Sequence, residues 1–177
     1  MIYPQTPAPI NTIPLSLGFD TVSTTLTDNV TQGRLRQFKP KRGFDLQYAT
    51  KDIEPIDTFY KDTFGLSSFT FVRPLKGVFK REFVAKVTSS ATVFDLPCCQ
   101  ATDIIVSVGG VTADVDIQVG AGRDGRDRAV FSAPVAVDSI IRVDFKGLLV
   151  CDCKFEGSMS SALLPLSYTG SVRLVTI

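Results

Sequence analysis

The sequence contains no histidine among its 177 residues, and this absence removes several kinds of enzyme chemistry. Histidine is the most common general base at neutral pH and the usual partner of a serine or cysteine nucleophile. Zinc enzymes that hold their metal through imidazole nitrogens are excluded for the same reason. We therefore expect a protein that is not an enzyme and that binds no cofactor.

Long hydrophobic runs and an excess of one charge are also lacking. The net charge is +1, so the chain has no overall attraction to nucleic acid or to an acidic membrane. No apolar run approaches the roughly 20 residues of a membrane-spanning helix. The first residues, Met-Ile-Tyr-Pro-Gln-Thr-Pro, lack the basic start and apolar core of a secretory signal. These features predict synthesis in the cytosol, with neither a membrane nor a sequence-specific nucleic acid as partner.

The two signs of charge are, however, unevenly distributed along the chain. Residues 31–90 hold 12 Lys and Arg against 6 Asp and Glu, whereas residues 91–177 hold 7 against 10. Opposite local charges favour side-by-side or head-to-tail assembly of identical copies. The alternative is that they are only unevenly solvated faces.

Alternation of apolar and polar residues is the strongest positive feature of the sequence. From Val111 to Val119 every second residue is apolar, which predicts one strand with a dry face and a wet face. The elements predicted around it are further strands and turns, at residues 104–108, 109–110, 120–128, 129–131 and 139–145. Shorter alternating patterns predict other half-buried strands, with apolar residues at Phe44, Leu46, Tyr48, Phe69, Phe71, Phe83, Ala85, Val87, Leu149, Cys151, Cys153 and Phe155.

One stretch has helical rather than strand periodicity. Apolar residues recur at steps of three and four from Ile53 to Phe64, which predicts one apolar helix face. Asp52 can accept the free amides of the first turn, Pro55 is tolerated within that turn, and Gly65 can end the helix. The predicted helix spans about 53–64.

These patterns together predict a mainly β protein. We expect a β-sandwich or barrel with the one flanking helix at about 53–64 and a hairpin-rich second β lobe. The domains expected are a proline-rich extended arm at 1–14, a β domain made of 15–87 with 146–177, and the hairpin-rich lobe at 88–145. The arm is expected to lie on its own body or on a neighbouring copy.

The polar tip at 120–128 contains Gly120-x-Gly122-x-x-Gly125, which has the spacing of a dinucleotide-binding loop. That loop must open a helix, whose N-terminus holds the pyrophosphate, and here another strand is predicted instead. We therefore predict a mobile hairpin tip that contacts a partner protein through ion pairs of Arg123, Asp124, Arg126 and Asp127.

A second predicted contact region is a run of basic residues. The run consists of Arg34, Arg36, Lys39, Lys41 and Arg42, with Phe38 and Phe44 nearby. Basic residues among aromatics can hold single-stranded nucleic acid. Because Gly33, Pro40 and Gly43 indicate a loop, we favour contact with an acidic protein surface.

Two further groups of side chains have metal-binding alternatives. The four cysteines, Cys98, Cys99, Cys151 and Cys153, could be buried thiols, disulfides or a metal-binding thiol cluster. Neither cysteine pair has the Cys-x-x-Cys spacing of a structural metal site, so buried thiols are favoured. Asp114 and Asp116 could bind calcium or act as a glycosidase pair, but the solvated face of an amphipathic strand is the favoured interpretation.

Several stretches of the chain resemble proteins of phage tails. Gly33-Arg-Leu-Arg-Gln-Phe38, Arg42-Gly-Phe-Asp-Leu-Gln-Tyr48 and Ser68-Phe-Thr-Phe-Val-Arg-Pro74 resemble minor tail proteins of long-tailed bacteriophages. The stretches 90–97, 105–112 and 129–145 follow an order common in phage tail modules. Val150-Cys-Asp-Cys-Lys-Phe-Glu156 is similar to a strand in distal tail proteins of gene transfer agents.

The resemblance implies a structural virion protein without enzymatic activity. Distal tail proteins form a ring, often a homohexamer, between the tail tube protein and the baseplate hub protein, and have a tail-tube-like β core with one helix. The implied location is the tail tip of the virion, assembled in the cytoplasm of the bacterial host. Two other functions are compatible with the sequence: residues 88–145 could form a glycan- or receptor-binding β-sandwich module, or the protein could be a hydrolase that uses Asp114 and Asp116.

Overall fold

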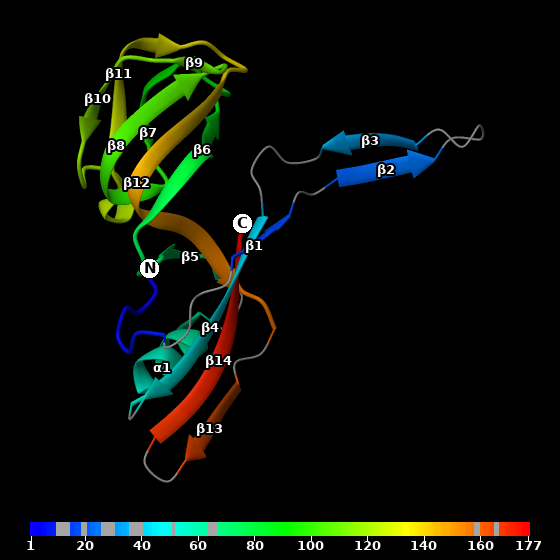
Figure 1. The fold of residues 1–177 in the computed structure, drawn as a ribbon, viewed down its shortest axis with the longest axis vertical. Coiled ribbons are helices and arrows are strands. Elements are labelled where there is room, and N and C mark those ends of the chain that lie inside the picture. The colour runs from blue at the N-terminus through cyan, green and yellow to red at the C-terminus, as the bar shows by residue number, and fades with distance from the viewer. Residues whose placement is uncertain are drawn as a thin grey trace. The chain divides into compact units, whose positions relative to one another are not determined.

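The computed structural model describes residues 1–9, 15–18, 21–25, 31–35, 41–50, 52–63, 67–157, 160–164 and 167–177. The described residues are mainly β and form open antiparallel sheets with one α-helix (Figure 1), so the predicted fold class is confirmed in its β-sandwich form and not as a closed barrel. Beyond the first two residues, the chain divides into unit 1 (residues 3–69 and 152–177) and unit 2 (residues 70–151). The predicted ring-forming role of 15–87 with 146–177 stays a prediction.

Unit 1 is built on an antiparallel sheet in which β4 (Lys41–Thr50) lies between β1 (Leu15–Gly18) and β14 (Ser167–Thr176). On its other side β14 pairs with β13 (Ser160–Leu164) and, through Leu174–Thr176, with the end of β12 (Ile140–Phe155). The predicted alternation in β4 is confirmed: Phe44, Leu46 and Tyr48 are buried, whereas Asp45 and Gln47 are exposed.

The single helix, α1 (Glu54–Asp62), lies in unit 1 as predicted, with slightly shorter bounds. The Asp52 carboxylate accepts the amide of Glu54 at 2.9 Å, and a proline occupies the first turn. Ile56 and Phe59 are its buried residues, so the predicted apolar face is confirmed. The predicted end at Phe64 and Gly65 lies outside the described residues.

The N-terminal arm is fixed to unit 1 by one aromatic side chain. Tyr3 is only 2% exposed, and its ring packs against Phe59, Phe69 and Phe155, with ring centroids 5.4, 5.6 and 6.2 Å away. Its hydroxyl lies 2.8 Å from the hydroxyl of Tyr48. Of the two places predicted for the arm, residues 1–9 therefore take the one on their own body, and residues 10–14 lie outside the described residues.

Unit 2 is a sandwich of two sheets. In one sheet, the first part of β12 pairs with β6 (Gly77–Lys86) on one side and with β8 (Cys98–Val108) on the other. The short strand β9 (Val111–Thr112) pairs antiparallel with the end of β8. In the other sheet, β11 (Arg128–Val135) lies between β10 (Val115–Gln118) and β7 (Ala91–Asp95). β5 (Phe69–Val72), at the boundary of the two units, pairs with β12.

Irregular residues interrupt the two strands beside β12. Arg81 in β6, and Gln100 and Asp103 in β8, have φ values of 54°, 50° and 54°, and the pairing register shifts near each. Such β-bulges bend a strand and re-aim its side chains. The bulge at Arg81 explains why Glu82 is buried while Phe83, expected on the dry face, is only partly buried.

The prediction of one continuous strand from Val111 to Val119 is wrong. The segment contains two strands, because β9 pairs with β8 in one sheet and β10 pairs with β11 in the other. The chain changes sheets next to Asp114, and Val111 and Val119 are 73% and 67% exposed. Alternation along one segment therefore did not produce one continuous dry face.

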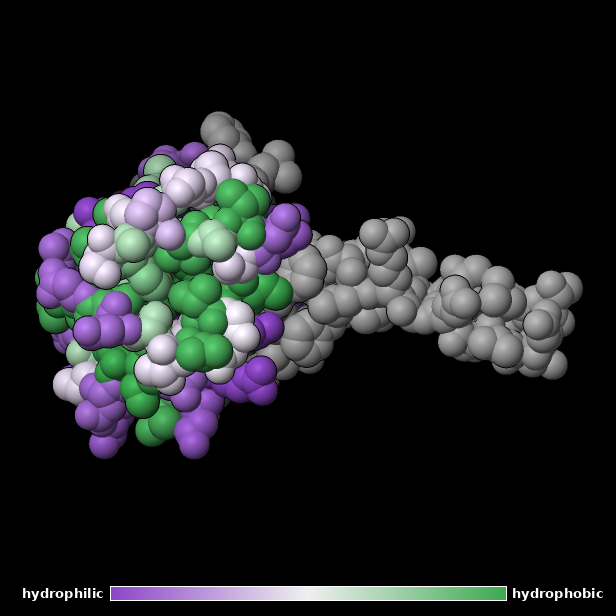
Figure 2. All heavy atoms as spheres, turned by 90° about the horizontal axis from the view of Figure 1, so that it is seen from above, coloured by the Kyte–Doolittle hydropathy of each residue, from purple (hydrophilic) through white to green (hydrophobic). Residues whose placement is uncertain are grey.

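β2 (Thr21–Thr25) and β3 (Thr31–Leu35) form a two-stranded antiparallel sheet, in which neither pairs with another described strand. Apolar side chains also reach the surface among hydrophilic ones, as Figure 2 shows. Among the described helices, none is long and apolar enough to cross a membrane.

Candidate functional site

The loop at 120–128, predicted as a mobile tip, is instead held by a buried carboxylate. The Asp127 side chain is completely buried and accepts the amide of Gly120 at 2.9 Å and the amide of Ala101 at 3.0 Å. The Asp127 backbone also bonds to Leu96 and Cys98. The prediction of a mobile tip considered only the local sequence, whereas Asp127 also bonds to Ala101 and Cys98 of β8 and to Leu96.

A second carboxylate, Asp95 at the end of β7, fixes the other side of this loop. It accepts the Arg123 amide at 3.0 Å and the Arg128 guanidinium at 2.8 Å. Burial would raise the pKa of Asp95, but these two donors outweigh burial and hold its pKa below the ordinary value. A Cβ at Gly122 would lie 2.7 Å from the Asp95 carboxylate, so the close approach requires glycine.

The glycine motif in this loop does not open an α-helix. Arg123–Gly125 forms a 3-10 turn (η1), and the chain then enters β11. Asp124 has a φ of 55° and accepts a hydrogen bond from the Thr70 hydroxyl at 2.6 Å. The spacing therefore serves a tight structural turn, without the helix N-terminus that a dinucleotide pyrophosphate needs.

The four predicted contact residues of this loop differ in accessibility. Arg126 and Asp127 are buried, so their side chains have an internal role. Asp124 is partly exposed, and the Arg123 side chain is 63% exposed. Contact with a partner through Arg123 and Asp124 stays a prediction.

The predicted basic run is not assembled into one surface by the described residues. Arg34 belongs to β3, and Arg36 and Lys39 lie outside the described residues. Lys41 is exposed, but Arg42 is only 6% exposed, and its amide donates to the Thr176 hydroxyl at 2.9 Å. Arg42 is thus an internal residue of unit 1, contrary to its predicted place in an exposed loop.

All four cysteines are free thiols, and Cys98, Cys151 and Cys153 are buried. Burial, together with the nearby Asp127 carboxylate, raises the pKa of the Cys98 thiol far above its ordinary value. Burial also raises the pKa of the partly exposed Cys99. Within the described parts of the chain, no three Cys, Asp or Glu side chains form a possible metal site.

The two aspartates weighed as a catalytic pair lie on the surface. Asp114 and Asp116 are both exposed, and the Asp116 carboxylate accepts only a long hydrogen bond of 3.3 Å from the Gln118 side-chain amide. This position matches the solvated strand face that the sequence favoured.

The buried tyrosine pair predicts an alkaline loss of stability. Burial raises the pKa of Tyr48 to about 12, although its bond to Tyr3 opposes the rise, and burial raises the pKa of Tyr3 further still. Unfolded tyrosines titrate near pH 10, so the unfolded chain loses protons first. The stability contributed by the pair is therefore complete below pH 10 and falls as the pH rises through about 12.

This expectation can be tested by urea unfolding at several pH values from neutral to strongly alkaline. The free energy of unfolding should decrease above pH 10, and a Tyr3→Phe, Tyr48→Phe double variant should show a weaker decrease over the same range. Equal slopes for the two proteins would contradict the assignment.

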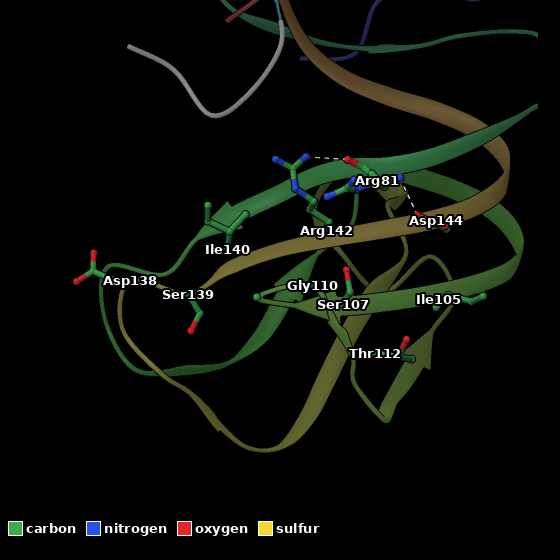
Figure 3. Close-up of a pocket in the computed structure, with 11 residues that line it drawn as sticks. Arg81, Ile105, Ser107, Gly110, Thr112, Asp138, Ser139, Ile140, Arg142 and Asp144 are labelled. Carbon is green, nitrogen blue, oxygen red and sulfur yellow. Dashed lines mark hydrogen bonds between the residues drawn. The ribbon is translucent and has the colours of Figure 1, made fainter. Parts of the chain in front are cut away.

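One hollow in unit 2 was not predicted from the sequence. It has a volume of about 780 Å³ and is bordered by β6, the hairpin of β8 and β9, and the start of β12. Figure 3 shows Arg81 and Arg142 lying together on one side of it, with Ser107 and Thr112 on the hairpin. The Arg142 guanidinium donates to the Arg81 carbonyl at 2.9 Å, and the Arg81 amide donates to Asp144 at 2.6 Å.

Comparison with known proteins adds no relative to this picture. No protein-family model matches the sequence, and no curated protein matches it significantly.

Proposed function

We propose that this protein is a structural subunit of a phage tail tip, most specifically a distal tail protein. In this proposal identical copies form a ring, with six copies as the expected number, that joins the tail tube protein to the baseplate hub protein. The basis is the resemblance of the motifs at 33–38, 42–48, 68–74, 90–97, 105–112, 129–145 and 150–156. The mainly β fold with one helix in unit 1 is compatible with the core that this resemblance implies.

The observation that carries the proposal is the isolated hairpin of β2 and β3. Its five paired positions run from Thr21↔Leu35 to Thr25↔Thr31, and neither strand pairs with any other described strand. A two-stranded hairpin is at best marginally stable alone in water and needs a further strand or a packing surface. A second copy of the chain can supply that surface, as a ring requires at every subunit.

The distribution of charge supports contact between unlike surfaces of neighbouring copies. Strand β3 of the hairpin lies in the segment 31–90 with excess Lys and Arg, whereas segment 91–177 has excess Asp and Glu. A ring is built from such heterologous contacts, in which each copy presents one surface to its neighbour's other surface. Opposite charges would favour this order over like-to-like pairing.

The hairpin provides a direct test by mass photometry. The wild-type protein, alone or mixed with its tail tube protein, should show a species near six times the 19.2-kDa monomer. Gly33 pairs with Ser23, and Gly33→Pro would remove a backbone donor and disrupt this ladder. We expect that variant to remain folded but to lose the ring.

The matched control is Gly33→Ala, which keeps the backbone donor and should still form rings. Added salt should weaken the ring, because screening reduces attraction between exposed charges. A wild-type protein that stays monomeric under all these conditions would refute the proposal. So would rings that form equally well from the Gly33→Pro variant.

A further inference from the structure

The wall of the hollow in unit 2 carries two arginines, Arg81 and Arg142, and two aspartates, Asp138 and Asp144. Within the described residues, the Arg81 guanidinium has no hydrogen-bond or ion-pair partner, and Arg142 uses one nitrogen for the Arg81 carbonyl. Asp138 pairs with Lys86 at 3.0 Å, and Asp144 accepts the Arg81 amide at 2.6 Å but keeps its negative charge. With Lys86 included, three cations face two carboxylates, which leaves a net charge of +1 at this wall. The free donors in the hollow are therefore mainly those of the two guanidinium groups.

The backbone places Arg81 at this position through a bulge. Its φ of 54° lies in the left-handed region, which glycine adopts without strain and arginine does not. Figure 3 shows the side chains of Arg81 and Arg142 next to each other on neighbouring strands. If residue 81 served only to form the bulge, glycine would be the more favourable residue at this φ. The presence of arginine therefore indicates a role for its side chain.

The other residues that line the hollow indicate what kind of molecule would carry an anionic group bound there. Ser107, Thr112 and Ser139 contribute hydroxyls, and a Cβ built at Gly109 or Gly110 would meet no atom within 4 Å, so the hairpin turn leaves open space. None of the described residues that line the hollow is aromatic, so none of them offers a ring on which a sugar could stack. Charge and hydroxyl bonding are the interactions that remain.

We propose that this hollow binds an acidic glycan, with a sugar oxyanion held by Arg81 and Arg142. Paired guanidinium groups suit carboxylate and phosphate oxygens, since both present several acceptors to planar donors. The sugar hydroxyls would bond to Ser107, Thr112 and Asp144. This binding does not depend on ring formation, because every residue that carries it belongs to unit 2.

The test uses the full-length protein and calorimetric titration with tetragalacturonic acid as the probe. The wild-type protein should bind it, whereas the fully methyl-esterified tetramer, which lacks the charge, should bind at least about tenfold more weakly. Phosphorylated oligosaccharides of similar length distinguish a phosphate ligand from a carboxylate ligand. Either result supports the proposal, provided that the acidic oligosaccharide binds more tightly than its uncharged counterpart. Equal binding of the acid and its ester would overturn it.

Matched variants separate this site from general charge attraction. Arg81→Gln should weaken binding by about tenfold or more, whereas Lys80→Gln, the same change at the exposed neighbour on β6, should change it less than about twofold. Arg81→Gly should also lose binding, but its melting temperature should equal or exceed that of the wild type, since glycine relieves the strained φ. A purely structural arginine would instead lower the melting temperature when replaced.

Three further outcomes would refute the proposal. One is equal loss of binding in the Lys80→Gln and Arg81→Gln variants, which would show unspecific attraction. Another is equal binding of tetraglutamate, an acidic peptide, or of inorganic phosphate alone, because either would remove the role of the sugar. The third is no binding of any acidic oligosaccharide at millimolar concentration.

Discussion

Replacing Tyr3 with alanine is expected to lower the free energy of unfolding of unit 1 by about 3–5 kcal/mol, the range typical of removing a large buried aromatic ring. The ring is almost completely buried among Phe59, Phe69 and Phe155, and the hydroxyl bonds to Tyr48. Its loss would leave a cavity at the centre of this aromatic cluster and release the N-terminal arm. Urea unfolding followed by circular dichroism measures the change.

Two further variants separate the contribution of the Tyr3 ring from that of its hydroxyl and from the effect of an exposed residue. Tyr3→Phe keeps the ring and removes only the hydroxyl, so it should cost about 1–2 kcal/mol, because the buried Tyr48 hydroxyl then lacks this bond. Ile2→Ala, at an exposed neighbour in the same arm, should change stability by less than about 0.5 kcal/mol. If Tyr3→Ala were as mild as Ile2→Ala, the arm would not be fixed to unit 1 in solution.

The second large effect is expected at Asp127. Asp127→Ala should lower the free energy of unfolding of unit 2 by about 2–4 kcal/mol, since the amides of Gly120 and Ala101 both lose a charged acceptor. Asp127→Asn should also be destabilising, because the asparagine oxygen can accept only one of the two hydrogen bonds and its NH2 group, a donor, then faces the other backbone amide. Thermal and urea unfolding would show both effects.

Asp116→Ala is the control for this prediction. Asp116 is an exposed aspartate on β10, and its replacement should change stability by less than about 0.5 kcal/mol. Hydrogen exchange gives a separate measurement, in which the Gly120 and Ala101 amides should exchange faster in the Asp127 variants. Unchanged exchange at these two amides would contradict the anchoring role of the carboxylate.

Sequence reasoning succeeded where a whole segment belongs to one sheet or one helix. In β4, Phe44 to Tyr48 alternate against a single core, and in β12, Leu149, Cys151, Cys153 and Phe155 are all buried as predicted. Helix α1 is predicted correctly because its apolar residues repeat at helical spacing, and because Asp52 precedes the helix and Pro55 lies in its first turn. In each case the local pattern and the surrounding structure impose the same requirement.

It failed where distant segments decide the outcome. Nothing in the alternation from Val111 to Val119 shows that the chain leaves one sheet and joins another beside Asp114. The burial of Asp127 depends on an amide of β8, 26 residues earlier in the chain. The hollow beside Arg81 depends on a bulge in β6, and an arginine at a position of positive φ has no sequence signature.

The pairing at the boundary of unit 2 has a consequence for how such a chain can evolve. The segment 70–151 interrupts the sequence of unit 1, yet its ends are tied together, as the Arg73 amide donates to the Leu149 carbonyl at 2.9 Å. An insertion whose two ends already meet adds little closure entropy to its host, however long it is. A change of length or sequence within unit 2 therefore leaves the chain ends that unit 1 must join at the same place.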